Sequence, residues 1–583
     1  MLSRKYQLLL IITILLSIYY PSLAAQLNSI DDVEMVTNLI NLGEWRLKDV
    51  FLPGSGMGLY YRPLLYLTFV IDKELWFMEG RFLHLENILL HLVSAILVFF
   101  LAASLLPQNR RHNSWLPLIA ALCFGLHPIA TESVNWVSGR TDLLACVFVL
   151  ASSLFLLKFK EKHKKKFLFI SLFALLLGML SKEVALLFLP GALFILIARN
   201  ADDNPAAVPV LSGFRQQAKR SLLFLLMGGG ALSLFFLMRS IAFHSNSSRI
   251  GMSIKFMLND PVHTIFVFLR AFGFYFKKFF WPFPLNFAIV EVDPLYELLA
   301  MLVVLLCIYI AWRRTLRSAI FLAGIFMLVP SFPIAYGQVA WTPYAERYMY
   351  IATAFVVTAS VLFLGTYLQE QRVTGGYLKA GALGLVIMMS VATFQRNLIW
   401  RTNVSLYTDT AQKSPTFTKA WNQLGIAYYE KNDYKNAEIY FAKASSLFEL
   451  NIDEKSDLNL AVVLVKQGKV KEAEAVYANM LNRGGYRSAK VVDHYIGFLS
   501  DKMEKEKDPA ALAVMKKKIL EAYKKLYAAN KDPIVLYKIG TLLNQLGDKR
   551  GARASYLTAY EMFPENDKYR GTISRQLMEM AKK

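Results

Sequence analysis

Residues 84–106 read HLENILLHLVSAILVFFLAASLL, a run long enough to cross a bilayer as one helix. Its polar residues His84, Asn87 and His91 recur at spacings of three and four, which place them on one helical face. Polar groups inside a membrane are costly, so this face is expected to meet a cavity or another helix. Two interpretations stay open: the three side chains line a polar site, or they form hydrogen bonds that pack helices together.

Comparable apolar runs recur up to residue 395, and a mixed polar pattern follows. We expect about eleven membrane-spanning helices of roughly 20 residues each. Their predicted bounds are 8–24, 84–106, 115–130, 142–158, 165–180, 184–198, 221–240, 294–312, 318–335, 348–367 and 379–395. The first run follows Arg4 and Lys5 and is predicted to stay uncleaved, because the later spans need a starting orientation. The sequence therefore predicts an all-α, polytopic membrane bundle over residues 1–401.

One apolar and aromatic stretch, residues 263–281, is left out of this count. It carries Arg270, Lys277 and Lys278, and treating it as a span would invert the orientation of everything after it. We interpret it as an interfacial or re-entrant helix whose basic side chains meet lipid phosphates.

The chain has 583 residues, is 55% hydrophobic and carries a formal net charge of +22. Within the apolar part of the chain, the positive charges gather in short loops such as 158–166 and 313–317, so anionic lipid headgroups rather than nucleic acid are the expected counter-charge. Among Lys and Arg residues, the short loops predicted to lie outside, 131–142, 181–183 and 336–347, carry only Arg140, Lys182 and Arg347. Because short basic loops remain in the cytoplasm, an odd number of spans places the C-terminal part outside.

Acids and cations gather in the loops predicted to lie outside. Asp31, Asp32 and Glu34 follow the first span, and adjacent carboxylates either take a proton from an acceptor or bind a cation. Arg140 has the planar fork of donors that suits a phosphate. The other polar residues of these loops are Arg62, His127, Glu132, Asp142, Lys182, Glu183, Glu346 and Arg347. Their convergence predicts a site for an anionic, lipid-attached substrate; a solvated acidic loop and an Arg140–Asp142 pair that ends a helix are the alternatives.

Several chemistries lack their sequence motifs. The chain has no GxxxxGK[ST], HExxH, GxSxG or CxxC, which disfavours an ATP-driven transporter and a zinc protease. The three cysteines lie within apolar runs, so a disulfide framework is not expected. A divalent metal at Asp31, Asp32 and Glu34 stays possible, although the aspartate pair alone offers too few oxygen ligands.

A repeat array follows the apolar part, beginning with residues 418–450. The tetratricopeptide positions are held there by Trp421, Leu424, Gly425, Tyr428, Ala437, Phe441 and Ala444. A second copy follows, residues 488–530 are predicted to form a longer helix pair, and a last copy ends at Pro564. The sequence predicts an α-solenoid over residues 402–583.

Such solenoids usually present a concave groove to a peptide or protein. Trp421, Asn422 and Tyr428 are the candidate contacts for an acceptor protein. A spacer or a dimerisation module is the alternative.

Five blocks of sequence, together with the face formed by His84, Asn87 and His91, carry a resemblance to a known family. The blocks are DD at 31–32, YRPLLYLTF at 61–69, HPIATESVNWVSGRTDLLA at 127–145, SKE at 181–183 and AERYMYI at 345–351. Together with the trailing repeats they resemble the transmembrane and TPR-repeat protein O-mannosyltransferases and their bacterial relatives. More distantly, the chain is similar to the polytopic glycosyltransferases of the GT-C class, which use polyprenyl-phosphate sugars.

The resemblance implies transfer of a sugar, mannose or similar, from a polyprenyl-phosphate donor on the outer leaflet to Ser or Thr of a secreted or surface protein, with inversion. It maps the catalytic acids onto Asp31, as general base, and Asp32, as its partner or as the group that orients the acceptor. A cation must receive the developing phosphate charge, and Arg140 is the first candidate, before Lys182 and Arg347. The groups expected to support them are Arg62, His84, His127, Glu132, Asp142, Glu183 and Glu346.

The repeat array is shorter and the outer loops are leaner than in the animal members. Both differences favour a bacterial relative, in the inner membrane with its site and repeats in the periplasm; in a eukaryote the repeats would lie in the lumen of the endoplasmic reticulum. Two alternatives stay open: a glycosyltransferase acting on an envelope glycan or lipid, and a non-enzymatic membrane-anchored repeat scaffold.

Overall fold

The computed structural model describes residues 3–52, 60–107, 114–199, 210–242, 257–336, 340–371, 375–447 and 454–582, together with Lys255. The chain divides into two compact units, residues 1–415 and 416–583. Helices form both units, as predicted, and the only extended pairings among the described residues are two isolated bridges, Arg199 with Thr315 and Ile289 with Tyr344. The boundary lies later than residue 401, because the helix Asn403–Lys413 packs on the first unit.

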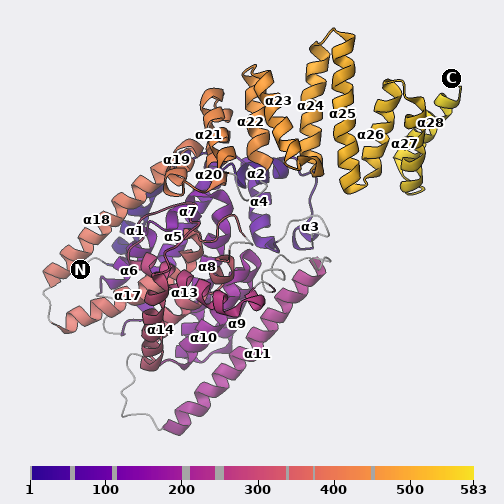
Figure 1. The fold of residues 1–583 in the computed structure, drawn as a ribbon. Coiled ribbons are helices and arrows are strands. Elements are labelled where there is room, and N and C mark those ends of the chain that lie inside the picture. The colour runs from indigo at the N-terminus through magenta and orange to yellow at the C-terminus, as the bar shows by residue number, and fades with distance from the viewer. Residues whose placement is uncertain are drawn as a thin grey trace. The chain divides into compact units, whose positions relative to one another are not determined.

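The first unit, called here the membrane unit, is a helical bundle (Figure 1). Its elements are α1 (Arg4–Tyr19), η1 (Tyr20–Ala24), α2 (Asp32–Ile40), α3 (Leu47–Phe51), α4 (Pro63–Trp76), α5 (Gly80–Ser104), α6 (Leu116–Gly125), α7 (Ala130–Asn135), η4 (Val137–Gly139), α8 (Arg140–Lys162), α9 (Lys165–Ser181), η5 (Glu183–Leu187), α10 (Phe188–Ile197), α11 (Val210–Ala242), α13 (Pro261–Phe280), α14 (Tyr296–Arg313), α15 (Leu316–Leu328), α16 (Ser331–Ile334), η6 (Glu346–Met349), α17 (Tyr350–Glu370), α18 (Gly375–Trp400) and α19 (Asn403–Lys413).

Eight helical segments in the described part of the chain are long and apolar enough to cross a membrane. They coincide with eight of the predicted spans, and the remaining three correspond to the shorter helices α6, α9 and η5–α10. The predicted number of about eleven is therefore not reached by length and composition in this part of the chain. The span predicted over 115–130 is shorter because α6 ends at Gly125 and a buried polar segment follows.

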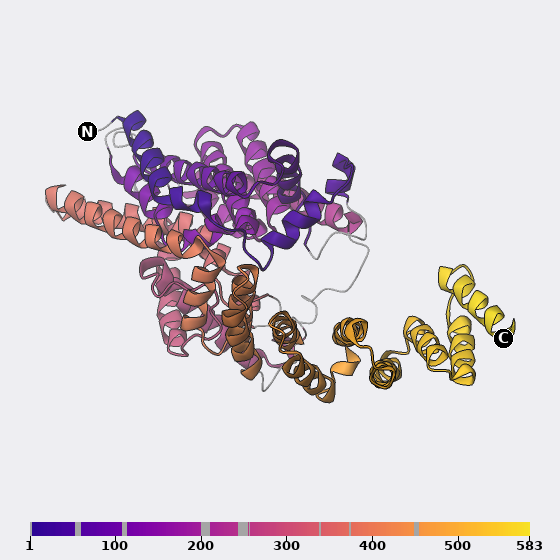
Figure 2. The same ribbon diagram turned by 90° about the horizontal axis from the view of Figure 1, so that it is seen from above.

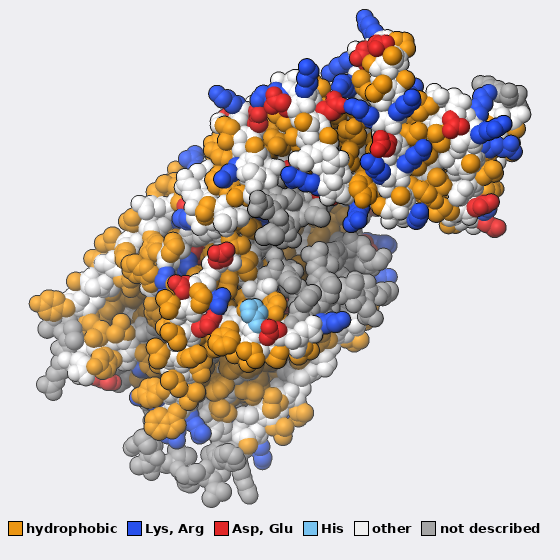
Figure 3. Space-filling view, in the orientation of Figure 1, with side chains coloured by type: hydrophobic (Ala, Val, Ile, Leu, Met, Phe, Trp, Pro, Cys, Tyr) orange, Lys and Arg blue, Asp and Glu red, His pale blue; other side chains and the backbone are white. Residues whose placement is uncertain are grey.

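The membrane unit places small residues where helices approach closely. A side chain on Gly191 of α10 would meet Ala323 of α15 at 2.6 Å, and one on Gly324 of α15 would meet α17 at 2.8 Å. By contrast, the spans within α11, α14 and α18 are only 17% buried, and their exposed side chains are largely apolar. Figure 3 shows the resulting apolar surface over much of this unit. These helices present the surface expected to face lipid.

The stretch predicted as an interfacial or re-entrant segment forms α13, which packs into the bundle. A Cβ on Gly273 would collide with the carbonyl of Tyr296, so α13 and α14 touch through their backbones. Arg270 forms an ion pair with Glu297 at 2.5 Å, and Lys278 forms a fully buried pair with Glu346 at 2.8 Å. Both basic side chains thus meet carboxylates of the protein.

The second unit, the repeat unit, is a row of helix pairs (Figures 1 and 2). Its elements are α20 (Thr418–Glu430), α21 (Tyr434–Ser446), α22 (Glu454–Lys466), α23 (Val470–Asn482), η7 (Gly485–Arg487), α24 (Ala489–Lys505), α25 (Pro509–Asn530), α26 (Pro533–Gln545), α27 (Lys549–Met562) and α28 (Lys568–Lys582). The longer pair predicted over 488–530 is confirmed as α24 and α25. Gly425 and Gly540 let Phe441 and Tyr556 of the paired helices approach, since a Cβ there would lie 2.5 and 2.8 Å from the rings.

Candidate active site

The two adjacent aspartates after the first span have different surroundings. Asp32 is fully buried, and its carboxylate accepts four hydrogen bonds: from the backbone N–H of Asn28 at 3.1 Å, of Val137 at 3.2 Å and of Ser138 at 2.9 Å, and from the Ser138 hydroxyl at 2.7 Å. Burial raises the pKa of Asp32 to about 6, and these donors oppose the rise. Asp32 therefore fastens the start of α2 to η4.

Asp31 precedes Asp32 as the residue before the first turn of α2, and it is exposed. Partial burial raises the pKa of its carboxyl, the Arg347 guanidinium lowers it, and Glu34 raises it. Arg347 therefore lies within electrostatic range of Asp31, although the two come from opposite ends of the membrane unit's sequence. Asp31 is a carboxylate that solvent, and hence a substrate, can reach.

Three cations stand at helix ends near one another, and each has its own carboxylate. Arg62 contacts Glu183 at 2.7 Å, Lys182 contacts Asp142 at 2.6 Å, and Arg347 contacts Glu132 at 2.5 Å. We call Arg62, Lys182 and Arg347 the cation cluster. Their side chains are 19%, 10% and 11% exposed, so each retains some access to solvent.

The three cations of the cluster act on one another electrostatically. Burial lowers the pKa of Lys182, Asp142 opposes this shift, and the charges of Arg62 and Arg347 lower the pKa further. Arg347 also lies 4.8 Å from the ring centres of Trp136 and Tyr348, which orient its planar guanidinium. The three carboxylates balance the three cations, and phosphate fits the donors of the two guanidinium groups and the ammonium group.

Arg140, the first sequence candidate for phosphate, lies elsewhere in the bundle. Its side chain is completely buried and contacts Asp72 at 2.5 Å and Glu86 at 3.0 Å. It also donates to the side-chain oxygens of Asn87 and Thr68 and to the Leu83 carbonyl, and it covers the Phe69 ring. We call these residues the buried arginine network. The predicted Arg140–Asp142 pair is replaced, since Asp142 bonds Lys182.

The polar face of residues 84–106 takes part in helix packing. Asn87 donates to the carbonyls of Val134 and Trp136 at 3.2 and 3.1 Å. His91 contacts the Tyr350 hydroxyl at 2.7 Å and the Gly125 carbonyl at 2.9 Å. His84 is likewise fully buried. For Asn87 and His91 this is the second of the two interpretations that the sequence left open.

The remaining sequence candidates also have protein partners. The His127 ring contacts the Phe279 carbonyl at 3.1 Å, and Glu346 binds Lys278 as described above. Gly139 permits the close return of η4 toward α7, because a Cβ there would lie 2.7 Å from the Ser133 carbonyl. Residues 127–142 thus supply donors to Asp32 and the carboxylate of Glu132 to Arg347.

Sequence reasoning did not find Asp72, Glu86, Asn28 or Ser138. Asp72 and Glu86 lie in helical segments, where an acid normally marks an exposed face, so no local signal pointed to Arg140. Asn28 and Ser138 form hydrogen bonds with Asp32 from distant parts of the chain. An Asn four residues before a helix-starting acid is the one local signal available.

The possible metal site does not fit the described residues. Both oxygens of Asp32 are taken by N–H and O–H donors, and no group of three or more His, Cys, Asp or Glu side chains in the described part of the chain could hold a metal ion.

In the repeat unit, the three predicted groove residues serve packing. Trp421 and Tyr428 stack on Tyr440 with ring centres 6.0 and 5.3 Å apart. Asn422 is buried and its side-chain oxygen accepts from Asn459 at 3.0 Å. Their role as acceptor contacts stays a prediction.

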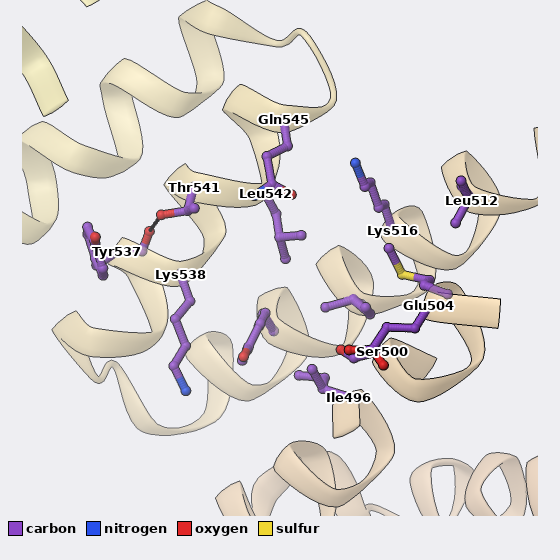
Figure 4. Close-up of a pocket in the computed structure, with 13 residues that line it drawn as sticks. Ile496, Ser500, Glu504, Leu512, Lys516, Tyr537, Lys538, Thr541, Leu542 and Gln545 are labelled. Carbon is purple, nitrogen blue, oxygen red and sulfur yellow. Dashed lines mark hydrogen bonds between the residues drawn. The ribbon is translucent and has the colours of Figure 1, made fainter. Parts of the chain in front are cut away.

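A cavity of about 620 Å³ lies further along the repeat unit, between α24, α25 and α26 (Figure 4). Its wall combines aromatic, aliphatic and charged side chains, and includes Ile496, Glu504, Lys516, Tyr523, Tyr537, Lys538 and Leu542. The size and mixed lining suit a peptide segment.

Family models match both the membrane unit and the repeat unit. Residues 88–356 match a family model described as a predicted membrane protein, DUF2142. Residues 418–449 and 534–566 match the tetratricopeptide repeat. A membrane domain followed by tetratricopeptide repeats is thus confirmed.

Similar curated proteins carry the name predicted from the sequence blocks. A Caenorhabditis elegans protein, Protein O-mannosyl-transferase F38B6.6, is 24% identical over 72% of this chain and 59% of its own length. Human Protein O-mannosyl-transferase TMTC4 is 36% identical over 21% of this chain and 19% of its own. Mouse Protein O-mannosyl-transferase TMTC3 is 42% identical over 16% of this chain and 10% of its own. This chain spans less than two thirds of the length of these relatives.

Proposed function

We propose that this chain is a membrane glycosyltransferase that moves a sugar, mannose or similar, from a polyprenyl-phosphate donor to Ser or Thr of a secreted or surface protein. The observation that carries the proposal is an exposed carboxylate, Asp31, together with three partly exposed cations, Arg62, Lys182 and Arg347. The charge of Arg347 lowers the pKa of Asp31, which places the two within electrostatic range. The names of the relatives support the same reaction class.

Each charge has a part in the proposed reaction. Asp31 takes the proton of the acceptor hydroxyl as its oxygen bonds to the anomeric carbon. The bond from that carbon to the phosphate oxygen breaks on the opposite face, so the configuration inverts and the phosphate stays on the lipid. The cation cluster stabilises the negative charge that develops on the phosphate. The counter-acids Glu183, Asp142 and Glu132 hold the three cations in place while no donor is bound.

In this proposal Asp32 and Arg140 do not touch the substrate. Asp32 helps to position Asp31, because its four hydrogen bonds fix the start of α2. Arg140 holds α4, α5 and α8 together through Asp72, Glu86 and Asn87. Arg62, expected at first only to support the site, becomes a phosphate ligand.

The repeat unit recruits the acceptor protein through the cavity between α24, α25 and α26. Aromatic and aliphatic walls would take an apolar side chain of the acceptor, while Lys516 and Lys538 would meet an acidic one. We place the site and the repeats on the outer side of a bacterial inner membrane, following the positive-inside rule.

Mass spectrometry of secreted and surface proteins tests this function, comparing cells that carry the wild-type chain, Asp31→Asn or no chain. We expect hexose on Ser or Thr with the wild type only, and equal membrane levels of both proteins. Unchanged protein glycosylation in all three strains contradicts the proposal and favours a scaffold. Loss of an envelope glycan or lipid with intact protein glycosylation also contradicts it, in favour of a different acceptor.

The recruiting role has its own test in the full chain. Tyr537→Ala and Lys516→Glu in the cavity should reduce acceptor modification, while Lys471→Glu, on the exposed face of α23, should not. Equal modification by all three variants removes the cavity from the proposal and leaves the reaction untouched.

A further inference from the structure

The loop that carries Asp31, residues 25–32, is held from the side by α19. Gln26 donates its backbone N–H to the Arg401 carbonyl at 3.0 Å, and its side-chain oxygen accepts the backbone N–H of Asn403 at 3.0 Å. The Asn403 amide in turn donates to the Leu27 carbonyl at 3.0 Å. We call residues 25–32 the acid loop. Helix α19 comes from the far end of the membrane unit's sequence, so these bonds close a long loop.

Tyr407 of α19 contacts two side chains of the acid loop through its hydroxyl. Its hydroxyl donates to the side-chain oxygen of Asn28 at 2.9 Å and accepts from the Ser29 hydroxyl at 3.2 Å. The Tyr407 side chain is completely buried, and its ring lies 6.2 Å from that of Phe287. A buried hydroxyl with a donor and an acceptor contact is costly to lose, because its partners then stay desolvated and unpaired.

Asn28, which Tyr407 contacts, is itself hydrogen-bonded to residues of the acid pair's turn. The same Asn28 oxygen accepts the backbone N–H of Ile30 at 2.9 Å, and the Asn28 N–H donates to Asp32 at 3.1 Å. The Asn28 carbonyl also accepts the N–H of Asp32. Fixing the Asn28 side chain therefore fixes the turn that places Asp31 at the start of α2.

We infer that Tyr407 is a positioning residue for the transfer reaction: through Asn28 and Ser29, it holds the acid loop and thereby fixes the place of Asp31 at the start of α2. This inference rests on the proposed function. Helix α19 directly precedes the repeat unit in the chain, so the same helix that begins the connection to the repeats orders the proposed base. A misplacement of a base by about 1 Å costs on the order of 100-fold in rate.

Tyr407→Phe in the full chain removes the hydroxyl and keeps the ring. Tyr350→Phe is the matched control, because Tyr350 is equally buried and its hydroxyl contacts His91, away from the acid loop. Hydrogen exchange of peptides covering residues 26–33 should rise in Tyr407→Phe and not in Tyr350→Phe. With mannosyl-phosphoundecaprenol as donor, kcat should fall about 10-fold or more in Tyr407→Phe with the donor KM unchanged.

The inference is overturned if hydrogen exchange in the acid loop is the same in Tyr407→Phe and Tyr350→Phe. An unchanged kcat in Tyr407→Phe also overturns it. If Tyr407→Phe does not accumulate, Ser29→Ala takes its place, because it removes the hydroxyl that donates to Tyr407 from a half-buried position. Hydrogen exchange over residues 26–33 and kcat are then measured for Ser29→Ala. Asp31→Asn separates the two hypotheses: full activity of that variant overturns the proposed function, whereas the exchange measurement reports on Tyr407 without any turnover.

Discussion

The membrane unit contains two clusters of arginines and acids that the sequence does not distinguish. In the buried arginine network, Arg140 is 0% exposed and its guanidinium contacts two carboxylates, two side-chain oxygens and a carbonyl. In the cation cluster, each cation has one carboxylate partner and remains 10–19% exposed. A fully satisfied, buried charge serves packing, whereas a partly exposed one can accept a further ligand. The comparison moves the proposed phosphate site from Arg140 to Arg62, Lys182 and Arg347.

The largest expected effect is on the stability of the buried network. Arg140→Met leaves Asp72 and Glu86 next to one another without a counter-charge, and loss of one partner of a buried pair costs about 3–5 kcal/mol. We expect a protein that does not accumulate or that loses its sharp thermal transition in detergent. A normal melting temperature together with lost donor binding would place Arg140 back in the phosphate site.

The aspartate pair should separate activity from stability. Asp31→Asn removes the proposed base from an exposed position, so transfer should fall by roughly 100- to 10,000-fold with the melting temperature unchanged. Asp32→Asn turns an N–H₂ group toward buried donors, so it should lose about 1–3 kcal/mol of stability. Thermal unfolding and single-turnover transfer of both variants check this. The reverse pattern would make Asp32 the base.

Arg62→Gln tests the cation cluster itself. Its pair with Glu183 is partly exposed, so the change should alter stability by less than about 1 kcal/mol. Donor binding should nevertheless weaken by about 10-fold, since one charge-assisted contact to phosphate is lost. The measurement is the donor KM, with Arg46→Gln as a control at an exposed pair outside the cluster. An unchanged KM removes Arg62 from the site.

The smallest expected effect is electrostatic. The exposed carboxylate of Glu34 raises the pKa of Asp31, so Glu34→Gln should lower that pKa. A base must be ionised, and the acidic limb of the profile of kcat/KM against pH should therefore move to lower pH, with a smaller shift at high salt. A limb that does not move would indicate that a different group governs it.

The sequence predicted the fold class, the repeat array and the long helix pair over 488–530, because hydrophobic period and small-residue spacing are local signals. That Asp31, Lys182 and Arg347 share one site stays a prediction. The sequence did not find the partner of Arg140, because Asp72 comes from another helix and its burial depends on tertiary packing. Nor did it show that Asp32 is a buried acid with its own hydrogen-bond donors, because two of those donors, on Val137 and Ser138, lie more than 100 residues away.

The most direct test of the central claim is to locate the lipid phosphate. Undecaprenyl phosphate carrying a diazirine next to the phosphate would be photo-cross-linked to the full wild-type chain, and the labelled peptides mapped. We predict labels on peptides that contain Arg62, Lys182 and Arg347, with loss of labelling when excess undecaprenyl phosphate competes. Labels confined to the basic loop 158–166, or absent from all three of those peptides, would contradict the account.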